Sequence, residues 1–384
     1  MKIKGTSFLN YSILSGLLNL ISSVYLAKLF TPETFGEYYS IIYVGSILYA
    51  ITSINSDPLF PYLKRHRVLV GLYNNMGFLF LFLGILFMLI IEEHKFGFSI
   101  IFCSGMFFSK GNFLDLISSR NYKVAGLKKI WMTLLSIGAK VFGGILQINF
   151  VLFISDLFQS LVFITKYKFQ VNDIIPFFKL NKEYFLKHFK YAFPQSIIDL
   201  VFEYIVPLFI AFKYGEYTLG LVFFMFTRVQ SLFQLLTVSF SQLIGSEFRF
   251  LDKQKKIKGF TNLLFIWILL NICFFLVLYF YGEFLVGLLF SEVWSVSVVY
   301  IVWAFPSLIF KNFSAIFGFI PVMYLLQNKS IYFSFFRFSA CLILMIFASI
   351  FVIDILLFWK IYMLVGFFTA LFQLFWYCNI ICTK

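Results

Sequence analysis

Long apolar runs separated by short polar segments are the dominant pattern along the chain. The runs are roughly 20 residues long and carry few charges, so each can cross a hydrocarbon core about 30 Å thick as an α-helix. Strands of a membrane β-barrel would be about half as long and would alternate apolar with polar residues, which these runs do not. The pattern therefore predicts an all-α integral membrane protein.

The breaks between runs predict the boundaries of the spanning helices to within a few residues. Twelve spans are expected, at residues 6–28, 36–57, 71–91, 97–118, 129–147, 150–166, 191–212, 218–245, 261–281, 294–326, 331–353 and 357–381. The tenth is long and contains Pro306 and Pro321, so we expect it to be kinked or broken.

Composition supports a membrane protein and excludes a nucleic-acid binder. The chain is 61% hydrophobic and only 12% charged, and its 58 Phe among 384 residues exceed what one soluble core can use. The net charge of +14 comes from basic residues in the short segments between spans, where they act as topology signals. The basic N-terminus leads into an apolar run without a small-residue cleavage site, so we interpret that run as a retained first span.

Lysine and arginine fall in alternate connecting segments. One set of segments holds most of them: Lys2 and Lys4; Lys64, Arg65 and Arg67; Arg120, Lys123, Lys128 and Lys129; the six lysines from Lys166 to Lys190; Arg249, Lys253, Lys255, Lys256 and Lys258; and Lys329. By the positive-inside rule this set is cytoplasmic, and so are both termini. The stretch "LAKLFTPETFGEYYS" (26–40) is then expected on the outer face.

Soluble-enzyme, metal and cofactor motifs are absent from the sequence. There is no phosphate-cradling glycine loop, and the five cysteines lie in apolar runs without a CxxC pair. The histidines His66, His94 and His188 are scattered through connecting segments, where we expect them to be solvated. We therefore expect no catalytic residues, no metal and no cofactor; coupling to a H+ or Na+ gradient stays open.

A polar segment near the middle predicts two six-helix bundles. The bundles would be residues 1–166 and 191–384, joined by an amphipathic cytoplasmic linker at 167–190. A shift of 184 residues carries Gly36 in the first outer turn onto Gly220 at the corresponding turn of the second half. It also relates Lys28 to Lys213 with one residue of slippage, so the halves are predicted to be parallel repeats.

The same shift relates polar positions of the first and seventh spans. Ser12, Ser15 and Asn19 share one helix face, and the shift carries them to three polar positions of the seventh span, Ser196, Asp199 and Glu203. The two carboxylates lie one turn apart. They either hold a coupling cation or proton, together with Asn19 and Gln234 in a polar cavity, or make hydrogen bonds within the bundle.

Basic residues within the spans are the strongest functional signal, because a charge at membrane depth costs several kcal/mol. Four lie near mid-depth: Lys110, Lys140, Arg228 and Lys311. They either line a cationic cavity that binds a pyrophosphate, or form ion pairs with acids of neighbouring helices such as Asp115, Asp156, Asp199 and Glu203.

The eighth span carries a polar stripe at helical spacing. Its members are Arg228, Ser231, Gln234, Thr237 and Ser241. Such a stripe is unfavourable against lipid, so it is expected to face a cavity or another helix.

Two stretches resemble bacterial polysaccharide transporters. "YLAKLFTPETFGEYYSI" is similar to the first outer turn of that family, and "YGEYTLGLVFFMFTRVQSLFQLLTVSFSQLIGSEF" to its seventh-to-eighth connection and eighth span. Together they resemble Wzx-type O-antigen or oligosaccharide-lipid flippases of the multidrug/oligosaccharidyl-lipid/polysaccharide (MOP) exporter superfamily. Lys28 stands where arginine is usual in the family, and the acids at 199 and 203 make the seventh span unusually acidic.

The resemblance implies a MATE/MOP-like fold and transport without covalent chemistry. The implied substrate is an undecaprenyl-pyrophosphate-linked oligosaccharide, an O-antigen or capsule repeat unit, moved from the inner to the outer leaflet by alternating access. Partners would be the bilayer and the polysaccharide polymerase and chain-length proteins of the same pathway. Lys28, Gly36 and Gly220 would be gate or structural residues.

Two other functions remain open from the sequence. A cation-coupled drug antiporter of the same superfamily needs a membrane carboxylate, for which Asp199 is available. A membrane glycosyltransferase, polymerase or ligase generally needs a sizeable outer loop, whereas every outer loop assigned here is short.

Overall fold

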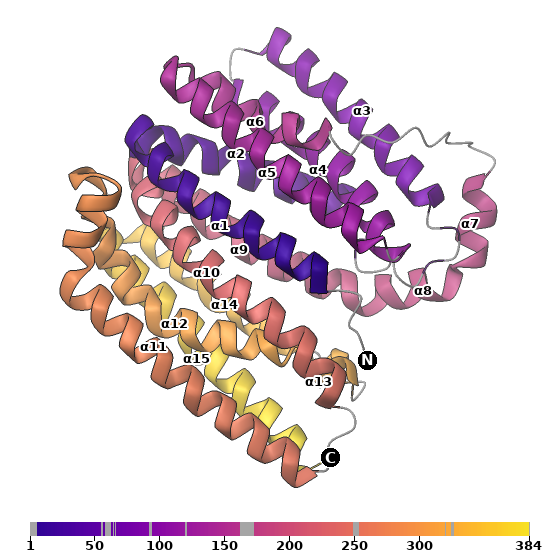
Figure 1. Cartoon of the computed structure of the whole chain (residues 1–384), viewed down its shortest axis with the longest axis vertical. Helices are drawn as coiled ribbons and strands as arrows, with labels where there is room; N and C mark the ends of the chain where they lie inside the picture. The colour runs from indigo at the N-terminus through magenta and orange to yellow at the C-terminus, as the bar shows by residue number, and fades with distance from the viewer. Residues whose placement is uncertain are drawn as a thin grey trace. The chain divides into compact units, whose positions relative to one another are not determined.

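The computed structural model describes most of the chain and contains only helices within the part that it describes (Figure 1). That part comprises residues 6–54, 57, 63, 65, 67–91, 94–119, 121–161, 173–248, 253–318, 320–323 and 326–383. A few side chains within the helices, including those of Ser12, Ser196, Gln234 and Ser241, lie outside the description.

The chain divides into two compact units, Met1–Ala211 and Phe212–Lys384. The first contains α1 (Thr6–Leu29), α2 (Pro32–Thr52), α3 (Arg67–Ile90), α4 (His94–Ser118), α5 (Tyr122–Ile145), α6 (Asn149–Leu161), α7 (Ile174–Leu180), α8 (Lys182–Lys187), a π-helical turn (His188–Ala192) and most of α9 (Phe193–Tyr214). The repeat in the sequence instead assigns the helix at 191–212 to the second half, and that assignment stays a prediction.

The second unit begins within the last turn of α9. It contains α10 (Glu216–Phe248), α11 (Lys253–Leu289), a 3-10 turn (Glu292–Trp294), α12 (Ser297–Ile316), α13 (Ile320–Met323), α14 (Gln327–Ile350) and α15 (Ile355–Thr383). Each of the twelve predicted spans overlaps one of the helices α1–α6, α9–α12, α14 and α15. The fold is therefore the expected membrane bundle of α-helices.

Six helices are long and apolar enough to cross a membrane by length and composition within the described residues. They are Arg67–Ile90, Phe193–Tyr214, Lys253–Leu289, Ser297–Ile316, Lys329–Ile350 and Ile355–Thr383. The predicted break in the tenth span is confirmed, because α12 ends at Ile316 and α13 starts at Ile320. Pro306 lies inside α12 and does not end it.

The same helix neighbours recur in the two units. In the first unit α4 packs on α2, α3 and α6, and α6 packs on α5; in the second α12 packs on α10, α11 and α15, and α15 packs on α14. These pairings match in chain order, which supports the internal repeat seen in the sequence. The fourth helix of each half is therefore the packing centre of its unit.

Hydrogen bonds between helices fix this packing where water is excluded. In the first unit Ser104 donates to the Gly77 carbonyl at 2.7 Å, and Asn112 donates to the side-chain oxygen of Asn74 at 2.9 Å. In the second, two indole N–H groups donate to carbonyls of α12, Trp267 to Ile309 at 3.1 Å and Trp359 to Tyr300 at 2.7 Å. Because hydrocarbon offers no alternative partner, such bonds specify which helix faces meet.

The first outer turn differs from the expectation. The sequence pattern predicts Gly36 in the turn, but α2 already starts at Pro32, and Gly36 is buried within that helix. Thr31 caps the helix, because its hydroxyl accepts a hydrogen bond from the Thr34 backbone N–H at 3.3 Å. Pro32 is tolerated at the first helical position because the backbone N–H that proline lacks would have no acceptor within the helix.

The corresponding turn of the second half shows the same correction. Gly220 is buried inside α10, and the glycine in the turn itself is Gly215, with a φ of +88° that favours glycine. Gly36 and Gly220 are thus helix-packing positions rather than hinges of the turns.

Close approach of α2 to α4 predicts the effect of one added methyl group. A Cβ on Gly45 would lie 2.6 Å from the Ser99 carbonyl oxygen, whereas a Cβ on Gly138 in α5 meets nothing within 4 Å. We expect Gly45→Ala to destabilise the protein by about 1–3 kcal/mol and Gly138→Ala to leave stability unchanged or slightly higher. Thermal unfolding of the detergent-purified variants measures the difference, and equal midpoints would contradict this packing.

Candidate functional site

A buried charge cluster joins three helices of the first unit. Lys140 of α5 donates to the Asp156 carboxylate of α6 at 3.1 Å and to the Tyr38 hydroxyl of α2 at 2.6 Å. Tyr38 in turn donates to the other oxygen of Asp156 at 2.5 Å, and Ser136 donates to the first at 3.2 Å. We call these four residues the Lys140 cluster.

Burial makes the bonds of the Lys140 cluster mutually dependent. Only 15% of the lysine side chain and 9% of the aspartate side chain are exposed. Removing one charge from such a pair strands the other in a medium of low dielectric constant, which costs several kcal/mol. The ammonium is therefore neutralised here, and it can reach a substrate anion only if the ion pair opens.

Lys110 of α4 is held much more loosely. Its ammonium lies 3.9 Å from the Asp57 carboxylate, and 48% of its side chain is exposed. Asp57 is also the acceptor for two phenols, Tyr49 at 2.7 Å and Tyr73 at 3.0 Å. Because those two bonds already position the carboxylate, Lys110 can leave it at low cost.

Arg228 of α10 has a different environment. Its guanidinium carbon lies 5.1 Å from the centre of the Phe224 ring, one turn earlier on the same helix. Its Nε is buried and has no hydrogen-bond partner among the described residues, and no described carboxylate forms an ion pair with it. A cation–π contact leaves the planar N–H fork available, so Arg228 combines positive charge with unused donors.

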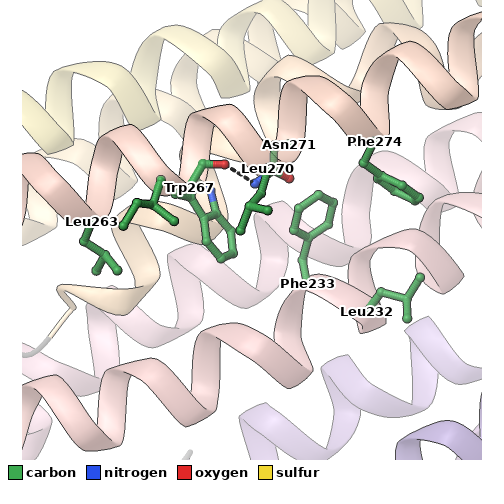
Figure 2. Close-up of a pocket in the computed structure, with 8 residues that line it drawn as sticks. Leu232, Phe233, Leu263, Trp267, Leu270, Asn271 and Phe274 are labelled. Atoms are coloured by element: carbon green, nitrogen blue, oxygen red, sulfur yellow. Dashed lines mark hydrogen bonds between the residues drawn. The ribbon is translucent and has the colours of Figure 1, made fainter.

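An apolar groove lies one turn further along α10, between that helix and α11. Its volume is about 360 Å³. Figure 2 shows the groove with its lining of Leu232, Phe233, Leu263, Ile266, Trp267, Leu270, Asn271 and Phe274. One side chain of the eight, Asn271, is polar, so the groove is suited to hydrocarbon.

Comparison with known proteins gives matches only among solved structures. No family model and no curated protein matches the chain. The inward closed conformation of the lipid II flippase MurJ aligns with a TM-score of 0.70 at 14% identity, over 96% of this chain and 86% of MurJ. An inward-facing multidrug resistance MATE family transporter of the MOP superfamily aligns with a TM-score of 0.60 at 12% identity, over 96% and 94%. The chain shares its fold with MOP-superfamily transporters.

A MOP superfamily transporter from Pyrococcus furiosus is also similar, with a TM-score of 0.56 at 13% identity over 98% of this chain and 94% of that one. These alignments cover nearly all of each chain, so the whole sequence, and not one bundle of it, adopts the MOP fold.

The remaining predicted site residues lie at several places in the MOP fold. Lys311 of α12 and Asp199 of α9 are half-buried, whereas Glu203 on α9 is exposed. Asn19 and Lys28 are both exposed on α1, the latter in its last turn. The Gln234 side chain lies outside the described residues. The predicted roles of these residues in substrate binding, coupling or gating stay predictions.

The described hydroxyls of the α10 stripe bond to their own helix. Ser231 donates to the Arg228 carbonyl at 2.9 Å, and Thr237 donates to the Phe233 carbonyl at 2.7 Å. These bonds satisfy the two hydroxyls without water, so Ser231 and Thr237 do not require an aqueous cavity. Within the described residues, no group of three or more His, Cys, Asp or Glu side chains is arranged to hold a metal ion.

Several functional contacts were not recognised in the sequence. Tyr38 and Ser136 were not singled out, and Asp57 lay at the predicted end of a span. The Lys140–Asp156 pair does have a sequence signal: α5 and α6 are joined by a short turn near Gln147, so residues at similar distances from it meet across the hairpin. Lys360 was also missed; its ammonium lies 4.4 Å from the Trp303 ring centre.

The Lys140 cluster predicts a large stability difference between two lysines. Lys140→Met strands the buried Asp156 and is expected to cost about 3–5 kcal/mol. Lys95→Met breaks the more exposed Lys95–Glu37 pair, at 3.3 Å, and is expected to cost no more than about 1 kcal/mol. The free energy of unfolding in detergent measures both.

A double variant completes this experiment. Lys140→Met with Asp156→Leu removes both charges and should recover much of the stability lost in the single variant. Equal losses for Lys140→Met and Lys95→Met would mean that the buried pair contributes nothing specific.

Proposed function

We propose that the protein is a flippase that moves undecaprenyl-pyrophosphate-linked oligosaccharide, an O-antigen or capsule repeat unit, from the cytoplasmic to the outer leaflet by alternating access. The observation that carries this proposal is Arg228, a half-buried cation whose described surroundings provide an aromatic ring but no carboxylate. A guanidinium in such surroundings favours an anion, and its planar fork fits phosphate oxygens.

Lys110 adds a second cation that can respond to a bound anion. Its ion pair is long and half of its side chain is exposed, so a phosphate can compete with Asp57 for the ammonium. Lys140 is less suited to this role, because contact with substrate would require opening of a buried ion pair. We therefore rank Arg228 and Lys110 above Lys140 as phosphate contacts.

The fold comparison supports movement of a lipid-linked molecule. One of the similar structures is described as a lipid II flippase, and the proposal extends lipid flipping to this chain. The charge distribution supports cytoplasmic termini, and the family resemblance implies the rest of the proposal: a bacterial cytoplasmic membrane location, coupling to a H+ or Na+ gradient, and action beside a polysaccharide polymerase and chain-length proteins.

A cation-coupled multidrug antiporter is the second candidate function. A similar structure is described as a multidrug resistance transporter, and Asp199 and Glu203 place two carboxylates one turn apart on α9. Such a transporter would favour cationic drugs, which Arg228 would repel. Drug sensitivity on gene deletion without any change in surface glycan would favour this alternative.

Substitution of Arg228 tests the flippase proposal. Loss of hydrogen bonds to a charged group costs about 1.5–3 kcal/mol, so Arg228→Ala is expected to lower the translocation rate about 10-fold to 100-fold. Arg228→Lys keeps the charge but loses the fork and should retain intermediate activity. The measurements are complementation of a flippase-null strain and translocation of lipid-linked oligosaccharide into vesicles containing the purified protein.

Lys253→Ala is the matched control. Lys253 is exposed at the start of α11, so its removal changes the net charge equally without altering the Arg228 surroundings. The proposal is wrong if the unmodified protein fails to translocate the lipid-linked oligosaccharide. Wild-type rates for Arg228→Ala would instead remove Arg228 from the substrate site.

A further inference from the structure

The groove between α10 and α11 faces outward along a strongly apolar helix. Two of its lining side chains, Leu270 and Ile266, are 64% and 52% exposed, whereas Trp267 at its floor is only 4% exposed. α11 has the most apolar window among the candidate spans, and little of that window is buried within the protein. In a bilayer this groove therefore opens laterally toward lipid chains.

The polar atoms at the floor of the groove are already engaged in hydrogen bonds. The Trp267 indole donates to the Ile309 carbonyl at 3.1 Å, and the Asn271 amide donates to the Trp267 carbonyl at 2.7 Å, as the dashed line in Figure 2 shows. The Phe233 ring lies 6.0 Å from the Trp267 ring, centre to centre. A ligand in the groove thus meets hydrocarbon and aromatic faces, with few polar groups to satisfy.

Arg228, a cation with unused donors, is on a helix that lines the groove. Leu232, which lines the groove, follows Arg228 by four residues and therefore lies on the same face of α10, about 6 Å further along the axis. The guanidinium lies on the other side of its own turn, toward Phe224. An anion site and a hydrocarbon site are thus separated by one to two helical turns.

This juxtaposition matches an amphiphile that has a phosphate head and a long apolar chain. We propose that the groove binds the polyprenyl chain of a lipid phosphate whose phosphate contacts Arg228; this inference rests on the proposed function and deepens it. The groove volume of about 360 Å³ lies within the usual range for small-ligand sites, so it holds a section of the chain while the remainder stays in the bilayer.

A groove-filling variant tests the inference. Leu270→Trp introduces an indole where the chain would lie, whereas Leu269→Trp makes the same change at the neighbouring position, which is 52% exposed and does not line the groove. The measurement is equilibrium binding of radiolabelled undecaprenyl phosphate to the purified full-length protein in detergent. We expect about 10-fold weaker binding for Leu270→Trp and unchanged binding for Leu269→Trp.

Two further arms identify which part of the lipid is recognised. Arg228→Ala should weaken binding of undecaprenyl phosphate but not of undecaprenol, which lacks the phosphate. Phosphatidylglycerol should compete poorly, because its phosphodiester carries one charge and two free oxygens, whereas the phosphate monoester of undecaprenyl phosphate offers the guanidinium a higher charge and three terminal oxygens. Equal competition by phosphatidylglycerol, or unchanged binding in Leu270→Trp, would overturn the inference.

Folding and function are separated by independent measurements. Ile266→Trp fills the same groove from an exposed position, so it replaces Leu270→Trp if that variant does not purify as a monodisperse protein. If the wild-type protein translocates lipid-linked oligosaccharide but Leu270→Trp and Ile266→Trp bind normally, the groove is wrong and the proposed function stands. If Leu270→Trp and Ile266→Trp weaken binding but the wild-type protein does not translocate lipid-linked oligosaccharide, the groove inference stands and the proposed function is wrong.

Discussion

Exclusion of water from the bilayer core is the constraint on which the rest of this structure depends. Each polar group within a span must find its partner inside the protein, since hydrocarbon supplies none. Ser104, Asn112, Trp267 and Trp359 meet this requirement with bonds between helices, and in doing so they determine which helix faces pack. Ser231 and Thr237 meet it within their own helix and leave packing to the apolar side chains.

Under the same constraint, the intramembrane cations differ in how completely neighbouring side chains neutralise them. Lys140 is compensated by Asp156 and Tyr38, and it contributes to the joining of α2, α5 and α6. Lys110 has a distant carboxylate and substantial exposure, while Arg228 has an aromatic ring in place of a carboxylate. A cation with an incomplete set of partners gains the most from a bound anion, so Lys110 and Arg228 are better candidates for anion binding than Lys140.

Hydropathy predicted the helices because burial in lipid depends on composition over about 20 residues, not on individual contacts. It could not predict local turn chemistry: Thr31 and Pro32 start α2 early, which moves Gly36 into the helix. Nor could it predict tertiary pairing. His188, expected to be solvated, is buried, and its Nε2 lies 3.1 Å from the Ile54 carbonyl oxygen. Lys140 was singled out correctly as an unusual charge, but its partners come from three helices, and only the fold brings them together.

If the protein moves a lipid with a large polar head, as we propose, a groove that is open to the bilayer also lowers the energetic cost of that movement. Transfer of each chain methylene into water costs about 0.8 kcal/mol, so a long polyprenyl chain cannot leave hydrocarbon during transport. Only the phosphate and sugars then require a polar route. A helix that offers a guanidinium at one turn and an apolar groove at the next meets both requirements with a single rigid element, because the head can exchange its contacts while the chain stays in hydrocarbon throughout.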